Sequence, residues 1–216
     1  TLAPLAAKVT QLGEQLEVSP EALHQRMHKR ALVFLQEMIC KALTKIQTLD
    51  QVCEDGLLTY FTKVYLVDST GFGLPESLKD LFPGFGGSAT QAGAKIQTVW
   101  DYKSSRFDHF ALTAWNIPDN KYVDTVVPFA QKGLLFLWDL GYFKVQALAH
   151  LAKASAYFLS RLNHQTHIYE TVAGHLRPLA LVPYLHAVKG NIAEKDIVIG
   201  AKDQVKSRLI VSRVPE

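Results

Sequence analysis

The sequence has few cysteines, little charge imbalance and no long apolar run. Its two cysteines, Cys40 and Cys53, are too few for a disulfide framework and lack metal-site spacing. The 23 lysines and arginines nearly balance the 20 acidic residues, so the composition indicates no strongly basic nucleic-acid-binding arm. The longest stretch without a charged residue is glycine-rich and covers 14 residues, Leu81 to Ala94. A membrane-spanning helix needs about 20 apolar residues, so we expect none.

Several common catalytic and binding motifs are also missing. Lys95 follows a glycine-rich stretch, but its spacing is not that of a nucleotide-binding P-loop. No Gly-x-Ser-x-Gly or cysteine–histidine arrangement indicates a covalent nucleophile. Two histidine pairs, His24 with His28 and His164 with His167, have no third ligand near them in sequence. A zinc site is therefore not favoured.

The composition that remains is that of a folded, globular protein. Of the 216 residues, 48% are hydrophobic and 20% are charged, which is far from the profile of a disordered chain. This length suits one large domain, or one domain with a small appendage. The apolar pattern changes near residue 60, so we predict a helical region over 1–61, a core over 62–162 and a β-rich segment over 163–216.

The N-terminal region has the periodicity of helices. Apolar residues recur every three or four positions from Leu2 to Leu16. Ser19 and Pro20 have the pattern of a second helix start, and an apolar stripe follows them. Near its start this second helix has a basic outer face, which includes Arg26, Lys29 and Arg30. Short helices with such a face suit DNA docking, but an ordinary solvated helix face explains the same charges.

From residue 62 the chain alternates between short strand-like runs and helices. The first run covers 64–67 and is closed by Asp68, and residues 69–71 have the composition of a turn. Further strands are predicted over 95–102, 107–115, 134–138 and 156–162, with helices over 118–132 and 144–153. This order fits an antiparallel meander of three strands, followed by two parallel strands reached through crossovers. The rest is predicted to be mostly extended, with runs over 168–172, 179–188, 197–199 and 207–214.

Two aspartates stand where predicted strands end. Asp68 closes the first strand and Asp139 closes the strand over 134–138, and these strands are neighbours in the expected topology. Ligands of such sheets bind at the carboxyl ends of the strands, so both carboxylates would project from one edge. Carboxylates hold Mg²⁺, and two such ions about 3.5–4 Å apart promote phosphoryl transfer. Each aspartate also suits a turn, where its side chain bonds its own backbone.

Four ordered segments of the chain carry a family resemblance. They are Val67-Asp68-Ser69-Thr70, Gly93-Ala94-Lys95, Asp139-Leu140-Gly141-Tyr142-Phe143 and Tyr157-Phe158-Leu159-Ser160-Arg161. The set resembles the insertion-sequence-4 family of DDE transposases, and the resemblance covers most of the chain. It implies an α/β (α+β) fold, in which a ribonuclease-H-like mixed sheet with flanking helices follows an N-terminal helical region. Residues 163–216 match the β-rich insertion of that family.

The resemblance also implies a metal site. Asp68 and Asp139 match the first and second metal-binding acids, which would hold Mg²⁺ or Mn²⁺, with two ions in the complete site. The third acid of the family is a glutamate in the signature Tyr-x2-Arg-x3-Glu-x6-Lys. That signature is absent around each of the later glutamates, Glu170, Glu194 and Glu216. We therefore expect the chain to be truncated before the third acid, with two of the three metal ligands.

The function implied is DNA transposition by metal-dependent cleavage and strand transfer at insertion-sequence ends. The partners would be double-stranded DNA, contacted through the basic helix face and Arg161, and a second copy of the protein in a homodimer. No membrane association is expected, and the location would be cytoplasmic and nucleoid-associated in a bacterium or archaeon. Two alternatives stay open: a catalytically dead remnant that only binds or regulates DNA, and a stand-alone metal nuclease with Glu170 or Glu194 as third ligand.

Overall fold

The computed structural model describes residues 3–12, 17–26, 33–34, 37–38, 41, 56–86 and 91–213. The chain divides into two compact units, Thr1–Asp50 and Gln51–Glu216. The first unit contains helices α1 (Ala3–Leu12) and α2 (Pro20–Arg26), as the periodicity predicts. The Ser19 hydroxyl accepts a hydrogen bond from the backbone N–H of Ala22 over 3.1 Å, which is the expected cap of α2.

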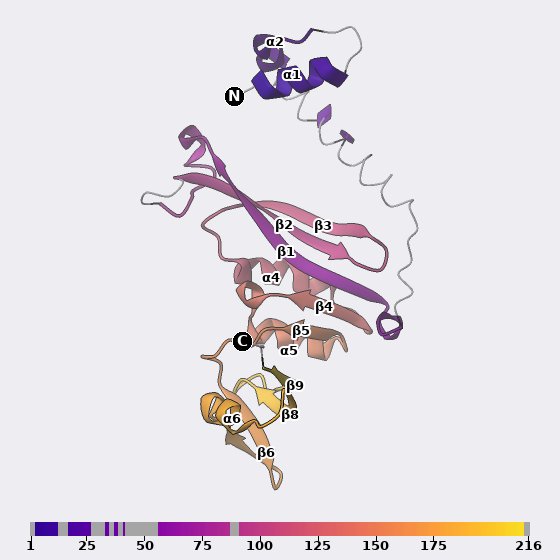
Figure 1. Ribbon diagram of the computed structural model, residues 1–216, viewed down its shortest axis with the longest axis vertical. Helices are drawn as coiled ribbons and strands as arrows, with labels where there is room; N and C mark the ends of the chain where they lie inside the picture. Colours follow the sequence, from indigo (N-terminus) through magenta and orange to yellow (C-terminus); the bar gives the residue numbers. More distant parts are fainter. Residues whose placement is uncertain are drawn as a thin grey trace. The chain divides into compact units, whose positions relative to one another are not determined.

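Five strands of the second unit form one mixed sheet (Figure 1). They are β1 (Lys63–Leu74), β2 (Ala92–Asp101), β3 (Arg106–Ala114), β4 (Leu134–Trp138) and β5 (Tyr157–Ser160). Their order across the sheet is β3-β2-β1-β4-β5; β2 is antiparallel to β1 and β3, whereas β1, β4 and β5 run parallel. The predicted topology is thereby confirmed. Short 3-10 turns flank β1, namely η1 (Leu58–Tyr60) and η2 (Glu76–Leu78).

The first strand is longer than the sequence predicted. Its parallel pairing with β4 ends at Val67, opposite Trp138, but its antiparallel pairing with β2 continues to Leu74. Asp68 therefore lies within β1 instead of closing it, and residues 69–71 form strand instead of the predicted turn. Asp68 is still the first residue beyond the part of β1 that pairs with β4.

Two glycines explain why a stretch with turn composition forms a strand. A Cβ atom at Gly71 would lie 2.9 Å from the Trp115 side chain, and one at Gly93 would lie 2.2 Å from it. Glycine at both positions therefore lets the indole pack directly on the backbone of the β1–β2 hairpin. Gly71, which suggests a turn in the sequence, serves this packing contact instead.

Two helices, α4 (Asp119–Val126) and α5 (Val145–Lys153), cover one face of the sheet. Their side chains join those of the sheet in one buried core, which contains Tyr65, Val67, Phe136, Trp138, Tyr122, Val123, Leu148 and Leu151. The helix predicted over 118–132 ends earlier, because Pro128 lacks a backbone N–H, and the chain continues as the 3-10 turn η3 (Val127–Phe129). A further turn, η4 (Leu140–Tyr142), follows β4. None of the helices within the described ranges has the length and apolar character of a membrane span.

The opposite face of the sheet is partly exposed in the described part of the chain. Leu66, Leu137 and Leu159 lie side by side on it in the strand register, and the Leu159 side chain is 59% exposed. Asp68 lies on the same face, because it stands two residues after Leu66 on β1.

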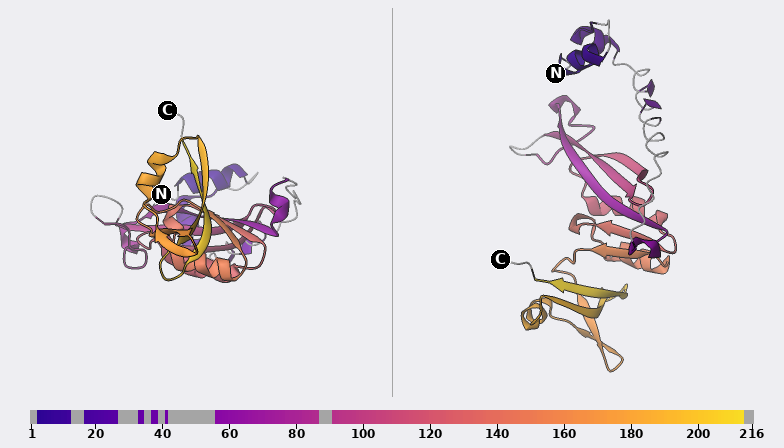
Figure 2. Two further views of the ribbon diagram at one scale, coloured as in Figure 1. Left: turned by 90° about the horizontal axis from the view of Figure 1, so that it is seen from below. Right: turned by 45° about the vertical axis from the view of Figure 1, so that its right-hand side comes forward.

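A second sheet follows in the chain, in the order β7-β6-β8-β9. Its strands are β6 (Ile168–Val172), β7 (His175–Pro178), β8 (Ile192–Ile199) and β9 (Val205–Ser212). Ile168, Ile197 and Ile199 belong to the same buried cluster as α5, so this sheet shares the core of the first. Figure 2 shows its strands, coloured orange to yellow, in two further views.

The segment between β7 and β8 differs from the sequence prediction. Residues 179–188 were predicted to be extended, but Leu181–Ala187 form helix α6. Leu179 and Leu181 pack against the core, which anchors the start of this helix. Pro183 is tolerated because it falls in the first helical turn, where a backbone N–H has no partner within the helix.

Candidate active site

The structure brings three of the sequence-predicted site residues together. Asp68, Asp139 and Arg161 line one shallow, open depression of about 670 Å³. Asp139 directly follows β4 and Arg161 directly follows β5, while Asp68 is the first residue of β1 beyond its pairing with β4. The three side chains therefore stand where the parallel pairing of β1, β4 and β5 ends on its carboxyl side, which is where ligands of such sheets bind.

Backbone N–H groups hold both carboxylates. The N–H of Ser69 donates to Asp68 Oδ1 over 2.8 Å, and the N–H of Gly141 donates to Asp139 Oδ1 over 2.7 Å. Both aspartates are exposed, and within the described residues neither forms an ion pair with a lysine or arginine. Their remaining oxygen lone pairs are therefore free to accept a cation or water from solvent.

A third aspartate, Asp119, lies beneath this pair on the covered face of the sheet. Asp119 is the first residue of α4, and its Oδ1 accepts three hydrogen bonds. The donors are Lys95 Nζ at 2.6 Å, Gln97 Nε2 at 2.8 Å and the Ser69 hydroxyl at 3.3 Å. Burial would raise the pKa of the Asp119 carboxyl, but these hydrogen bonds and the charge of Lys95 outweigh it and lower the pKa below its usual value. Asp119 is therefore a charged acceptor whose Oδ1 takes three hydrogen bonds.

Gln97 extends this cluster to the turn that follows Asp139. Its Oε1 accepts a hydrogen bond from the Tyr142 hydroxyl over 2.7 Å, and both side chains are buried. Burial is the main cause that raises the pKa of Tyr142, so the hydroxyl remains a donor. Gln97 thus donates to Asp119 and accepts from Tyr142, and its amide orientation is fixed by both partners.

The donor set suits a hard divalent cation but is incomplete. Asp68 and Asp139 offer carboxylate oxygens, which Mg²⁺ and Mn²⁺ prefer. In the described part of the chain no group of three or more His, Cys, Asp or Glu residues has the arrangement of a metal site. Asp119 does not join Asp68 and Asp139 in such a group, and its Oδ1 already accepts hydrogen bonds from Lys95, Gln97 and Ser69.

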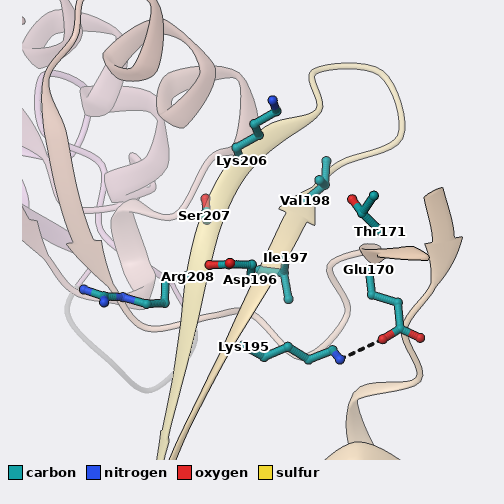
Figure 3. Close-up of a pocket in the computed structure, with 9 residues that line it drawn as sticks. All are labelled: Glu170, Thr171, Lys195, Asp196, Ile197, Val198, Lys206, Ser207 and Arg208. Atoms are coloured by element: carbon teal, nitrogen blue, oxygen red, sulfur yellow. Dashed lines mark ion pairs between the residues drawn. The ribbon is translucent and has the colours of Figure 1, made fainter. Parts of the chain in front are cut away.

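The two glutamates considered as alternative third ligands lie in the second sheet. Glu170 and Lys195 form an ion pair of 2.7 Å at the edge of a groove between β6, β8 and β9 (Figure 3). Glu194 pairs with Arg208 over 3.2 Å. Neither glutamate lines the depression that contains Asp68 and Asp139. The geometry therefore gives no support to a site completed by Glu170 or Glu194.

The predicted basic helix face is described only in part. The Arg26 guanidinium is exposed and donates to the carbonyl oxygen of Ala22 over 3.0 Å. Lys29 and Arg30 lie outside the described residues.

The Asp119 cluster is not predicted from the sequence. There Lys95 is assigned only to a rejected P-loop and to the family segment Gly93-Ala94-Lys95, and Tyr142 only to the segment that follows Asp139. The signal available was Pro118-Asp119 at a predicted helix start, but nothing in it points to Lys95 or Gln97, which come from another strand.

The known proteins that this chain resembles are transposases. A family model described as a transposase DDE domain matches residues 59–209. The transposase for insertion sequence element IS1151 of Clostridium perfringens is 29% identical over 230 residues, covering 100% of this chain and 48% of its own length. The transposase for IS231F of Bacillus thuringiensis subsp. israelensis is 30% identical over 157 residues, covering 70% of this chain and 32% of its own. The chain thus spans between a third and a half of the length of these relatives.

Proposed function

The chain belongs to the family of transposases with a DDE domain, and from that premise we propose that it forms the catalytic core of an insertion-sequence transposase. The reaction is cleavage and strand transfer of double-stranded DNA at the ends of the element. The observation that carries this proposal is that Asp68 and Asp139 line one open depression, at the point where the parallel pairing of β1 with β4 ends.

In this proposal Asp68 and Asp139 are the ligands of the catalytic metal. DDE transposases generally use divalent metal ions, and we propose two Mg²⁺ or Mn²⁺ ions in the complete site. Such ions, when bound, activate the attacking hydroxyl or water and stabilise the charge of the leaving oxygen. The two carboxylates fix where the ions stand, and Arg161 at the rim of the depression contacts a DNA phosphate.

We further propose that the full-length protein supplies a third carboxylate. In the insertion-sequence-4 family, which the ordered motifs resemble, this acid is a glutamate that follows a β-rich insertion. Two observations support the idea: no three-acid group occurs in the described part of the chain, and the relatives are considerably longer than this chain. The apolar face next to Asp68, with the half-buried Leu66 and Leu137 and the exposed Leu159, offers a surface on which a covering segment would pack.

The remaining parts of the proposal concern organisation and partners. We assign residues 1–61 to DNA binding, 62–162 to the catalytic core and 163–216 to the β-rich insertion. Arg26, Lys29 and Arg30 contribute the basic surface of the first region. Paired cutting of two element ends requires two active sites, which favours a homodimer, and DNA as substrate favours a cytoplasmic, nucleoid-associated location. None of these observations favours a catalytically dead remnant.

The test is cleavage of labelled element-end DNA by the full-length protein. Asp68→Asn and Asp139→Asn are each expected to lower the cleavage rate by roughly a thousandfold, because each removes a ligand of the ions that stabilise the transition state. DNA binding measured without a divalent metal should survive. Asp196→Asn, which changes an exposed aspartate on β8, is the matched control and should cleave normally. Normal cleavage by either Asp68→Asn or Asp139→Asn would contradict the role of that residue.

A further inference from the structure

The Asp119 cluster reaches both segments that carry the exposed carboxylates. On the β1 side, Asp119 Oδ1 accepts a hydrogen bond from the Ser69 hydroxyl over 3.3 Å. The backbone N–H of the same serine donates to Asp68 Oδ1 over 2.8 Å. Successive residues of a strand point to opposite faces, so Ser69 joins the covered face to the carboxylate on the open face.

On the β4 side the connection passes through the turn η4. Tyr142, in this turn, donates its hydroxyl proton to Gln97, which in turn donates to Asp119. Gly141, in the same turn, supplies the N–H that holds Asp139. A Cβ atom at Gly141 would lie 3.1 Å from Asp139 Oδ1 and 3.4 Å from Asp119 Oδ2, so both carboxylates lie close to this glycine.

From this arrangement we propose that Asp119, with Lys95 and Gln97, is a positioning residue that fixes Asp68 and Asp139 relative to each other for metal binding. The inference rests on the proposed function, because it concerns the same two carboxylates. Asp119 touches neither substrate nor metal in this proposal. It acts through Ser69 on one side, and through Gln97 and the η4 turn on the other.

The charges of the cluster fit a positioning role. The side chain of Lys95 is 8% exposed and that of Asp119 is 27% exposed, so the ion pair is largely removed from water. A buried pair of this kind gains little stability over well-packed apolar residues, but it fixes geometry through directional hydrogen bonds. Lys95 also neutralises Asp119, so the cluster adds no net negative charge beneath the two metal-binding carboxylates.

The experiment compares Mg²⁺ titrations of DNA cleavage by the full-length protein. Groups that orient metal ligands typically contribute 10- to 100-fold in metal affinity or activity, so Asp119→Asn is expected to raise the half-saturating Mg²⁺ concentration about tenfold. Ser69→Ala and Tyr142→Phe each remove one hydroxyl and should raise it by a smaller factor. Metal-free DNA binding should not change in any of the three.

Two further variants separate positioning from folding. Asp119→Asn leaves Lys95 without its counter-charge and could unfold the domain, so the double variant Lys95→Met/Asp119→Asn removes both charges together and should show the same raised Mg²⁺ requirement. Asp124→Asn is the matched control, because Asp124 is also on α4 and pairs with Lys144 over 2.6 Å away from the site. It should titrate like the wild type.

The outcomes are distinct for the two proposals. Folded Asp119 variants that titrate with Mg²⁺ like the wild type, while only their melting temperature falls, would show a purely structural cluster and overturn the inference. The proposed function would survive that result as long as Asp68→Asn and Asp139→Asn abolish cleavage. Normal cleavage by those two variants would overturn the proposed function, whatever the Asp119 variants do.

Discussion

The two faces of the five-stranded sheet differ in the burial of their side chains. On the covered face the polar side chain of Gln97 is buried, and it is hydrogen-bonded to Asp119 and Tyr142. On the open face Leu112 is 53% exposed and Leu159 is 59% exposed, and Asp68 stands free of any ion pair within the described residues. The comparison indicates how the exposed Asp68 carboxylate is positioned. Ser69 donates its backbone N–H to Asp68 and its hydroxyl to Asp119 on the covered face.

The largest difference between the two faces should appear in stability. Phe136 on β4 is fully buried, so Phe136→Ala is expected to lower the free energy of unfolding by about 3–5 kcal/mol. Leu159→Ala, on the open face of β5, should lower it by less than about 1 kcal/mol in the chain of 216 residues, because most of that side chain is already in water there. Urea unfolding of the two variants measures both values. Equal losses would mean that the open face is covered in solution.

The polar contacts of the covered face should contribute less than its apolar core. Tyr142→Phe leaves the buried Oε1 of Gln97 without its donor, and this should cost about 1–3 kcal/mol in the free energy of unfolding. Tyr157→Phe is the matched control, because the Tyr157 side chain is 56% exposed and should tolerate the change. The same urea unfolding series applies, and an unchanged free energy for Tyr142→Phe would remove this hydrogen bond from the supporting cluster.

The close packing of the Asp139 and Asp119 carboxylates around Gly141 can be tested by substituting this glycine. The added methyl group of Gly141→Ala would press on the Asp139 carboxylate, which must move by a few tenths of an ångström. Small displacements of a catalytic group are costly, so the cleavage rate is expected to fall about tenfold while the melting temperature changes little. Cleavage at the wild-type rate would show that the position of Asp139 is not critical.

A smaller effect is expected on the free energy of unfolding at acidic pH. The hydrogen bonds and charge that outweigh burial lower the pKa of Asp119 in the folded state. The stability that this carboxyl contributes is therefore present above its ordinary unfolded-state pKa of about 3.9, and it is lost as the pH falls through the lower folded-state value. Asp119→Asn should flatten the dependence of the unfolding free energy on pH below about 4. A wild-type slope in this variant would contradict the assigned ion pair.

Much of the first sheet could be predicted from sequence. The apolar run at 134–138 coincides with β4. In the second sheet, the run at 168–172 coincides with β6. The predicted topology also brought Asp68, Asp139 and Arg161 to one edge of the sheet, where the structure has them. These features depend on local patterns and on general rules of strand connection.

The features that could not be predicted from the sequence depend on contacts between residues far apart in the chain. Residues 69–71 have the composition of a turn, but pairing with β2 and packing under Trp115 make them a strand. Asp119 accepts from Lys95, 24 residues away, and from Ser69, 50 residues away. No local pattern encodes such a cluster, because its members come from two strands and a helix that meet only in the fold.

The decisive measurement is metal rescue of an Asp139→Cys variant of the full-length protein in the cleavage of element-end DNA. Mg²⁺ prefers oxygen ligands, whereas softer ions accept a thiolate more readily. If Asp139 binds the catalytic metal, the variant should be inactive in Mg²⁺ and regain cleavage in Mn²⁺, and Asp196→Cys should cleave normally in both. Normal cleavage by Asp139→Cys in Mg²⁺ would show that this carboxylate is not a metal ligand.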